Sequence, residues 1–134
     1  MIHVLAAVIC LDDKFLIATR PDGAHLAGKW EFPGGKVEPY ETAWEGLRRE
    51  IKEELGVSII VIDKIFTTIF SYPEKTVCLD FYRAFPENRD DFYPKPLDGQ
   101  ELAWVGRSDM KSYDFAEADK DIINFLSGAN EKTE

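Results

Sequence analysis

Residues 35–57 read GKVEPYETAWEGLRREIKEELGV and bring Glu50, Glu53 and Glu54 within one helical turn. Side chains three and four positions apart share a helix face, where like charges repel one another. A merely solvated helix face explains this arrangement poorly. A divalent cation explains it well, because hard metals such as Mg²⁺ take oxygen ligands and usually share them with substrate phosphates. The stretch therefore predicts a metal-binding helix.

The two ends of this helix are marked in the sequence. Thr42 and Glu45 have the spacing of a capping box, and Gly56 supplies a stop. An apolar stripe that is expected to pack inward consists of Ala43, Leu47, Ile51 and Leu55. The glutamates lie on the neighbouring stripe, so we expect them at the edge of the core.

The apolar runs outside this helix predict a set of strands. They cover residues 2–11, 14–20, 30–33, 57–71, 76–85 and 101–106. Asp12-Asp13 separates the first two, which predicts a hairpin. Gly34-Gly35, after Pro33, is expected to be a flexible corner. The fourth and fifth runs are joined through Tyr72-Pro73-Glu74-Lys75, and residues 86–99 form a loop.

A second amphipathic helix is expected from Phe115 to Leu126, ending at Gly128. Strands around two amphipathic helices predict an α/β layered domain with a mixed sheet. The length of 134 residues favours one domain. We expect that domain to span residues 1–128 and residues 129–134 to be a disordered tail.

Charge and cysteine content limit the classes of function. Sixteen basic and 25 acidic residues give a net charge of −9, which lacks the basic footprint of a nucleic-acid-binding protein. An anionic small substrate is compatible with this charge, because bound cations reverse the field of an acidic site. Cys10 and Cys78 lie inside apolar runs and are expected to be buried thiols.

The N-terminal run, MIHVLAAVICLDDKF, has no basic leader, and acidic residues interrupt it. This pattern predicts a strand rather than a signal peptide or membrane span. We therefore expect a cytoplasmic protein that does not bind membranes.

The box residues have the spacing of a known signature. They are Gly35, Glu41, Arg49, Glu50, Glu53, Glu54 and Gly56. Every fixed position matches the Nudix box of the Nudix hydrolases, and the surrounding GKWEFPGGKVE resembles the MutT-type nucleoside triphosphate pyrophosphohydrolases. The resemblance spans nearly the whole chain. It implies a Nudix-type α/β/α sandwich with a mixed, curved β-sheet.

The resemblance also implies a metal site and a mechanism. Glu50, Glu53 and Glu54, with the carbonyl of Gly34 or Gly35, would hold Mg²⁺ or Mn²⁺. Such ions neutralise phosphate charge and acidify a bound water. By the same resemblance, Arg49 would orient the carboxylates and Glu41 would brace the loop.

The general base that accepts the proton of the attacking water has more than one candidate. The resemblance implies either Glu50, inside the box, or a residue of a later loop. Asp98 in LDGQELAW stands where many relatives carry glutamate. Glu101 is a weaker candidate, because polar strand residues usually face solvent.

The reaction implied by the resemblance converts a nucleoside triphosphate and water to the monophosphate and pyrophosphate. Arg20 and His25 resemble phosphate-contacting residues, and Lys75 stands where some relatives have arginine. Phe32 and Tyr72 could flank the base. An exposed loop histidine and ordinary core aromatics are the structural alternatives.

Asp119 stands where relatives have an asparagine that reads oxidised guanine. An ionised aspartate only accepts hydrogen bonds, which suits the amino group of cytosine. The Ala-Asp pair before an apolar helix resembles pyrophosphohydrolases acting on CTP and 5-methyl-dCTP. A protonated aspartate could read oxidised guanine, so 8-oxo-dGTP stays open. The alternative is a carboxylate that only stabilises the helix start.

Two other functions compete with this one. The first is hydrolysis of another nucleoside-diphosphate compound, such as ADP-ribose or a dinucleotide. The second is a non-catalytic nucleotide-sensing module, which would be expected to have lost box carboxylates; all survive here. For either enzyme the partner is a small nucleotide, and the protein is expected to be a monomer or homodimer.

Overall fold

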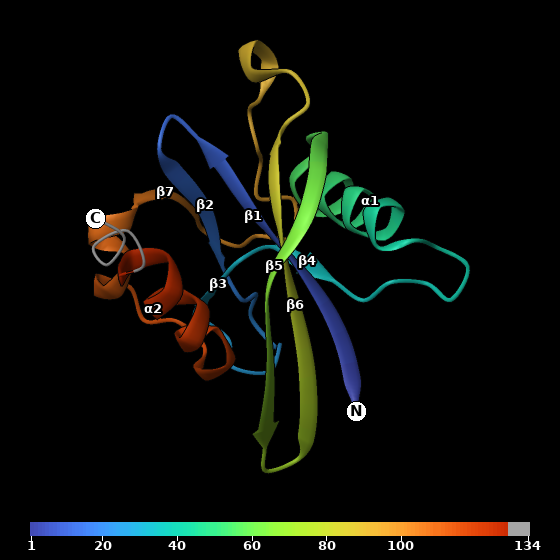
Figure 1. Ribbon diagram of the computed structural model, residues 1–134, viewed down its shortest axis with the longest axis vertical. Coiled ribbons are helices and arrows are strands. Elements are labelled where there is room, and N and C mark those ends of the chain that lie inside the picture. The colour runs from blue at the N-terminus through green and yellow to red at the C-terminus, as the bar shows by residue number, and fades with distance from the viewer. Residues whose placement is uncertain (129–134) are drawn as a thin grey trace.

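A computed structural model describes residues 1–128 of the protein. The predicted tail, residues 129–134, lies outside the described residues. Two α-helices lie on opposite sides of a strongly twisted sheet (Figure 1). The elements are β1 (Ile2–Leu11), β2 (Lys14–Thr19), β3 (Trp30–Glu31), β4 (Gly34–Gly35), α1 (Ala43–Leu55), β5 (Ile59–Tyr72), β6 (Lys75–Pro86), β7 (Leu102–Gly106) and α2 (Lys120–Gly128).

The sheet is mixed, as predicted. Its strands run in the order β3-β2-β1-β6-β5, with β4 added to β1 and β7 added to β2. Strands β1 and β6 are parallel, whereas β5 and β6 form an antiparallel hairpin. Two register shifts interrupt that hairpin between Val61 and Phe66, and such irregularities bend and twist a strand. The result is the curved sheet that the family resemblance implied.

Each face of the sheet supports one helix, because side chains alternate along β1. Ala6 and Val8 face the cluster that includes the α2 residues Ile122 and Leu126. The intervening residues, Leu5, Ala7 and Ile9, pack on the α1 side with Leu47, Ile51 and Leu55. The core therefore has two layers, and β1 forms the boundary between them.

Helix α1 begins and ends where the sequence predicts. The Thr42 hydroxyl accepts a hydrogen bond from the Glu45 N–H at 3.1 Å, and the Glu45 carboxylate accepts one from the Thr42 N–H at 2.9 Å. Gly56 closes the helix at φ 70°, a conformation that glycine adopts without strain. The β1–β2 turn also fits, because Asp12 and Asp13 both have positive φ, as a tight hairpin requires.

The predicted flexible corner at Gly34-Gly35 is wrong. These residues form strand β4, in which Gly35 pairs with Leu5 and Gly34 with Ala6. The preceding strand, predicted to reach Pro33, ends at Glu31. Pairing with β1 fixes the two glycines, so the segment before the metal-binding helix is held by the sheet.

The predicted start of the last helix at Phe115 is also wrong, because α2 begins at Lys120 after a short 3₁₀ turn at Glu117–Asp119. Phe115 forms a bridge with Trp30, and the Ala116 N–H donates to the Trp30 carbonyl at 3.0 Å. The backbone of Phe115 and Ala116 therefore pairs with β3 and cannot form the hydrogen bonds of a helix.

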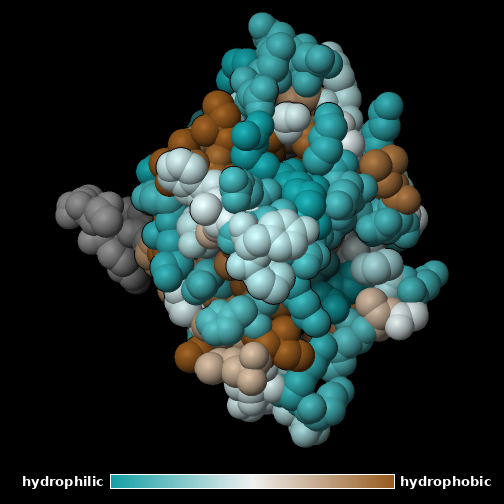
Figure 2. Space-filling view, turned by 90° about the vertical axis from the view of Figure 1, so that its right-hand side faces the viewer, coloured by the Kyte–Doolittle hydropathy of each residue, from teal (hydrophilic) through white to brown (hydrophobic). Residues whose placement is uncertain are grey.

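Burial of the cysteines is confirmed for one of the two. Cys78 is buried, but Cys10 is only half-buried near the end of β1. Within residues 1–128, no helix combines the length and apolar character needed to cross a membrane. The side of the molecule that carries α1 is hydrophilic over most of its area, and its apolar residues form separate patches (Figure 2).

Candidate active site

The three glutamates of α1 lie along one side of the helix. Glu50 and Glu54 are half-buried, whereas Glu53 is exposed. Burial raises the pKa of Glu54 to about 9, and a hydrogen bond with Glu50 and the Glu50 charge act in the same direction. Burial also raises the pKa of Glu50. Two carboxyl groups thus crowd together at the edge of the core, where a cation would relieve their repulsion.

Arg49 connects these glutamates to the loop before the helix. Its Nε donates to Glu41 Oε2 at 2.7 Å and its Nη2 to Glu41 Oε1 at 3.1 Å, a two-bond pairing. Its Nη1 donates to Glu53 at 3.2 Å and lies 3.4 Å from Glu50 Oε2. Glu41 in turn accepts from the Glu38 N–H at 2.9 Å. Arg49 therefore links Glu41 in the loop to Glu50 and Glu53 on the helix.

Gly34 lies tightly against strand β1, and Gly35 lies tightly against the Glu50 side chain of α1. A Cβ on Gly34 would lie 2.0 Å from the Leu5 carbonyl oxygen, and one on Gly35 would lie 2.5 Å from the Glu50 carboxyl. Neither position has room for a larger residue. The Glu50 carboxyl therefore lies directly beside the backbone of β4.

The donor set fits a hard divalent cation. The Glu50 and Glu54 carboxyl groups are hydrogen-bonded beside a glycine backbone that offers carbonyl oxygens, and Arg49 bridges Glu50 and Glu53 and balances part of their charge. An all-oxygen set of this kind suits Mg²⁺ or Mn²⁺ rather than a thiophilic metal. Of the predicted ligands, Glu50 and Glu54 are in contact, and Glu53 is linked to Glu50 through Arg49, with Gly34 and Gly35 as the possible carbonyl donors.

The two later candidates for the general base lie outside helix α1. Asp98 is exposed in a turn, where its N–H donates to Gln100 Oε1 at 2.9 Å. Its negative charge contributes to the raised pKa of Glu54, and the N–H of the preceding residue, Leu97, donates to the Glu54 carbonyl at 3.2 Å. Glu101 is exposed, and its N–H donates to the Thr19 hydroxyl at 2.9 Å. Glu50 is the candidate base that lies within the glutamate cluster.

A cavity of about 340 Å³ begins at β4 and extends along the α2 side of the sheet. Its volume is within the roughly 300–1,000 Å³ of small-molecule sites. All six residues predicted to contact substrate line it, namely Arg20, His25, Phe32, Tyr72, Lys75 and Asp119. Gly34, Gly35 and Lys36 line it too, and Gly35 also adjoins the Glu50 carboxyl, so the cavity begins next to the glutamates.

Glu31 also lines the cavity, and the sequence analysis missed it. Arg20 Nη1 donates to Glu31 Oε1 at 2.6 Å, and Arg20 Nε donates to the His25 carbonyl. Burial raises the pKa of Glu31, and Arg20 opposes that shift. The sequence did offer one signal, an acidic residue between the two aromatic residues Trp30 and Phe32. A carboxylate among apolar side chains is costly to bury unless a partner such as Arg20 pairs with it.

Asp119 is 3% exposed on the wall of the cavity. Burial raises its pKa well above the ordinary range, the charge of Glu31 adds to the shift, and Arg20 opposes it. This environment favours the neutral acid, which can both donate and accept a hydrogen bond. An ionised Asp119 would suit cytosine alone, whereas the neutral acid can pair with either cytosine or oxidised guanine.

The aromatic residues of the cavity differ in their surroundings. The Tyr72 hydroxyl accepts from the Ala118 N–H at 3.2 Å, and its ring lies edge-on to His25 with centroids 4.8 Å apart. Phe32 is 3% exposed and packs against Phe115 and Phe81. Phe32 is therefore a core residue that shows one edge to the cavity, whereas Tyr72 is fixed at its wall.

His25 lines the cavity, and one of its nitrogens is unpaired within residues 1–128. Its Nδ1 lies 3.4 Å from Glu74 Oε2. Its Nε2 is buried and has no hydrogen-bond partner among residues 1–128. Buried polar atoms are normally paired, so this nitrogen is a candidate contact for a bound ligand.

The chain is similar to proteins of known family. The NUDIX domain profile matches residues 4–125. The CTP pyrophosphohydrolase of Escherichia coli K12 is 35% identical over 125 residues, covering 92% of this chain and 89% of that protein. The 8-oxo-dGTP diphosphatase of Proteus vulgaris is 38% identical over 82 residues, covering 60% of this chain and 73% of that protein.

A solved structure agrees over nearly the full length. The crystal structure of the MutT protein from Methanosarcina mazei Go1 is 26% identical, with a TM-score of 0.82, and the match covers 98% of this chain and 96% of that one. Nudix hydrolases generally use a divalent metal, and the glutamate cluster has the donors to hold one. The domain profile and the full-length likeness establish that this chain belongs to the Nudix hydrolase family.

Proposed function

We propose that the protein hydrolyses a nucleoside 5′-triphosphate to the monophosphate and pyrophosphate, using Mg²⁺ or Mn²⁺. The observation that carries this proposal is the cavity that runs from β4, beside the Glu50 carboxyl, to Asp119. A phosphate chain held near the glutamates would extend its nucleoside into this cavity. Relatives named for CTP and for 8-oxo-dGTP support a triphosphate substrate from the nucleotide pool.

The phosphate end depends on α1 and its loop. Glu50, Glu53 and Glu54, with a carbonyl of Gly34 or Gly35, would hold the divalent ion. When bound, the ion neutralises phosphate charge and acidifies a water molecule. Arg49 keeps the carboxylates in place through its contacts with Glu50 and Glu53.

The proton of the attacking water goes to a carboxylate, and Glu50 is our first candidate. It is half-buried and lies in the cluster, whereas Asp98 is exposed in a turn. A general base must come within hydrogen-bond reach of the proton that it abstracts. Lys36, Lys75 and His25 Nε2 supply hydrogen-bonding groups around the cavity that could contact phosphates.

The nucleoside end depends on Asp119, with Glu31 and Tyr72 beside it on the cavity wall. A neutral Asp119 offers cytosine a donor for its ring nitrogen and an acceptor for its amino group. The same carboxyl could also pair with an oxidised guanine. We therefore propose CTP or dCTP, including 5-methyl-dCTP, and 8-oxo-dGTP as the substrates to test.

The test is pyrophosphate release by the purified protein with Mg²⁺ across a nucleotide panel. The panel contains CTP, dCTP, 5-methyl-dCTP, 8-oxo-dGTP, dGTP, ADP-ribose and a dinucleoside polyphosphate. Pyrophosphate from a cytidine nucleotide or from 8-oxo-dGTP supports the proposal. AMP from ADP-ribose or the dinucleotide would replace it with hydrolysis of a linked diphosphate. No turnover of any compound would favour a sensing module.

We further propose that the partner is a free nucleotide rather than a nucleic acid. The net charge of −9 opposes binding to a phosphate polymer, since that binding relies on neutralisation by basic residues. We propose a cytoplasmic monomer or homodimer, which sedimentation of the purified chain would distinguish.

A further inference from the structure

A second group of potential metal ligands lies on the other side of the strands that form the cavity. His3 of β1 and Cys78 of β6 are partners in the parallel pairing, and Asp80 lies two residues further along β6. The residues that alternate with them, Ile2, Val4, Val77 and Leu79, line the cavity. Because strand side chains alternate between faces, His3, Cys78 and Asp80 project from the opposite face.

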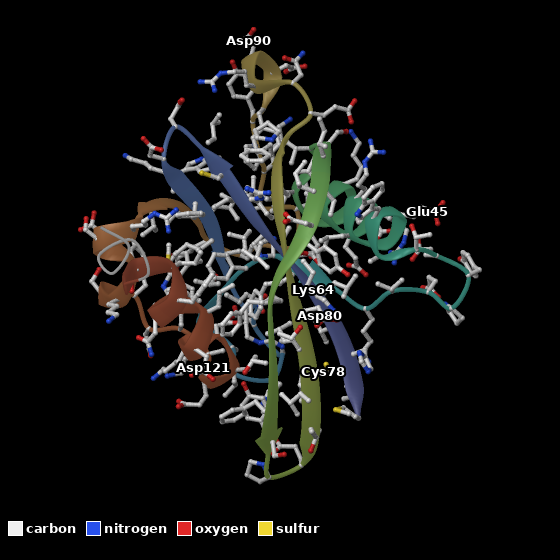
Figure 3. The ribbon with its side chains drawn as sticks, viewed as in Figure 1. Glu45, Lys64, Cys78, Asp80, Asp90 and Asp121 are labelled. Carbon is white, nitrogen blue, oxygen red and sulfur yellow. The ribbon has the colours of Figure 1, made fainter. Side chains whose placement is uncertain are left out.

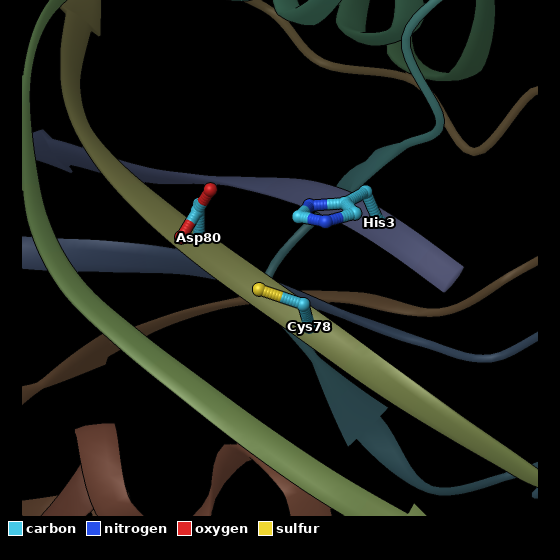
Figure 4. Close-up of side chains that lie close together, drawn as sticks. All are labelled: His3, Cys78 and Asp80. Carbon is cyan, nitrogen blue, oxygen red and sulfur yellow. The ribbon is translucent and has the colours of Figure 1, made fainter. Parts of the chain in front are cut away.

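The three side chains converge. Their candidate ligand atoms, an imidazole nitrogen, a thiol sulfur and a carboxylate oxygen, all lie within 4.8 Å of one another. Figure 4 shows the side chains directed into one space above β1 and β6. Ligands around a tetrahedral zinc ion are about 3.3–3.7 Å apart, given bonds of about 2.0–2.3 Å. His3 is exposed, so rotation of its imidazole can close this difference.

The carboxylate is already oriented. The Thr67 hydroxyl, on the neighbouring strand β5, donates to Asp80 Oδ1 at 2.6 Å. Such outer hydrogen bonds orient metal ligands and raise metal affinity. Lys64 and Asp80 lie close together (Figure 3), with 4.0 Å between Lys64 Nζ and Asp80 Oδ1. The Lys64 side chain is half exposed, so its ammonium group can move into water when a cation binds.

The donor types differ from those of α1. The helix offers only oxygen, which suits Mg²⁺, whereas a sulfur, nitrogen and oxygen set suits Zn²⁺ and similar ions. We propose that His3, Cys78 and Asp80 bind one Zn²⁺ ion, or a comparable transition-metal ion, at a site separate from the glutamate cluster. Three protein ligands leave a fourth position for water. The ion would join the start of β1 to β6 behind the cavity.

The experiment uses the full chain, reduced, with Mg²⁺ in large excess to occupy the glutamates. Co²⁺ is added as a spectroscopic substitute for Zn²⁺, and Zn²⁺ is then added in competition. We expect one equivalent of Co²⁺ to produce a cobalt–thiolate charge-transfer band, which Zn²⁺ abolishes. Absence of this band in the wild-type protein overturns the proposal.

Two variants test the ligands, and a third serves as their control. Cys78→Ser and His3→Ala should each weaken Zn²⁺ binding by more than about 100-fold, since loss of an outer hydrogen bond alone costs roughly 10- to 100-fold. Cys10→Ser removes the other thiol and should keep both the band and the affinity. His3 is exposed, so its variant remains informative if Cys78→Ser fails to fold. A charge-transfer band that persists in Cys78→Ser, or is lost in Cys10→Ser, contradicts the assignment.

Discussion

The glutamate cluster comes from one continuous segment of 20 or so residues, whereas the far wall of the cavity combines Arg20, Glu31, Tyr72 and Asp119 from separate parts of the chain. Helix periodicity and a capped start fix the cluster locally. The wall exists only after the sheet and α2 have assembled. Changes in the cluster should therefore abolish chemistry, and changes in the wall should alter which nucleotide is used. Four predictions test this contrast, from the largest expected effect to the smallest.

The largest effect is expected for Glu54→Gln. The amide keeps the shape of the side chain but removes a charged ligand, so turnover should fall by more than the roughly 10- to 100-fold typical of losing an outer contact. Pyrophosphate release at saturating Mg²⁺ measures it. Glu87→Gln is the control, because Glu87 is an exposed partner of Arg48 away from the site. Wild-type turnover in Glu54→Gln would contradict the metal assignment.

Substitutions at the two neighbouring glycines should have different effects, one on catalytic rate and the other on stability. In Gly35→Ala the new methyl meets the flexible end of Glu50, so the fold can adjust while the carboxylate moves. A displacement of about 1 Å can cost on the order of 100-fold in rate. In Gly34→Ala the methyl meets the Leu5 carbonyl, which should cost about 1–3 kcal/mol of stability.

Urea unfolding and kcat/KM, measured for both glycine variants, check this prediction. Gly35→Ala should lose activity with a near-normal free energy of unfolding, and Gly34→Ala should lose stability. Equal loss of stability in the two variants would show that their environments do not differ as described.

At the far wall, Asp119→Asn should alter selectivity more than overall rate. A carboxyl group can gain or lose a proton to suit its ligand, whereas an amide has a fixed donor and a fixed acceptor. We expect the ratio of kcat/KM for CTP to that for 8-oxo-dGTP to change by about 10-fold, the effect of one hydrogen bond. Asp121→Asn, an exposed change two residues later in the first turn of α2, is the control. An unchanged ratio would remove Asp119 from base recognition.

The smallest effect concerns the pH dependence of stability. The pKa of Asp119 is raised in the folded state, so the native protein keeps a proton that the unfolded chain releases above about pH 3.9. Stability is therefore lost as pH rises from the unfolded pKa to the folded one, at about 1.4 kcal/mol per pKa unit. The Asp119→Asn variant has no titrating carboxyl at this position, so it should not lose stability in this way as pH rises.

Thermal unfolding of wild type and Asp119→Asn without nucleotide, between pH 4 and 8, measures the difference. The variant should gain stability relative to wild type as pH rises, and the two should converge towards pH 4. A constant difference across this range would mean that Asp119 does not titrate as its burial implies.

The same contrast explains what could be predicted. Thr42, Glu45 and Gly56 act within a few residues of the helix ends, so its limits could be predicted from sequence. The strand at Gly34-Gly35 depends on Leu5 and Ala6, and the late start of α2 depends on Trp30. Those contacts join segments that are far apart in the sequence, so the local preference of a residue for helix or strand cannot predict them.

Site residues follow the same division. The box glutamates could be placed together from their spacing alone. Glu31 could not be found in this way, because its role depends on Arg20 and on a cavity closed by α2 and its preceding turn. The protonation state of Asp119 could not be predicted from sequence either, because it depends on how deeply the side chain is buried.

The parallel pairing of β1 with β6 has a consequence for synthesis of the chain. Strand β1 is synthesised well before its partner β6, which begins at Lys75. At about 5–20 residues per second, the chain from residue 12 to the end of β6 takes roughly 4–15 s to make. During that time the apolar middle of β1 cannot pair with β6, which has not yet been made. Those seconds are when the nascent protein is most exposed to aggregation, and earlier arrival of β6, as in a circular permutant, would shorten them.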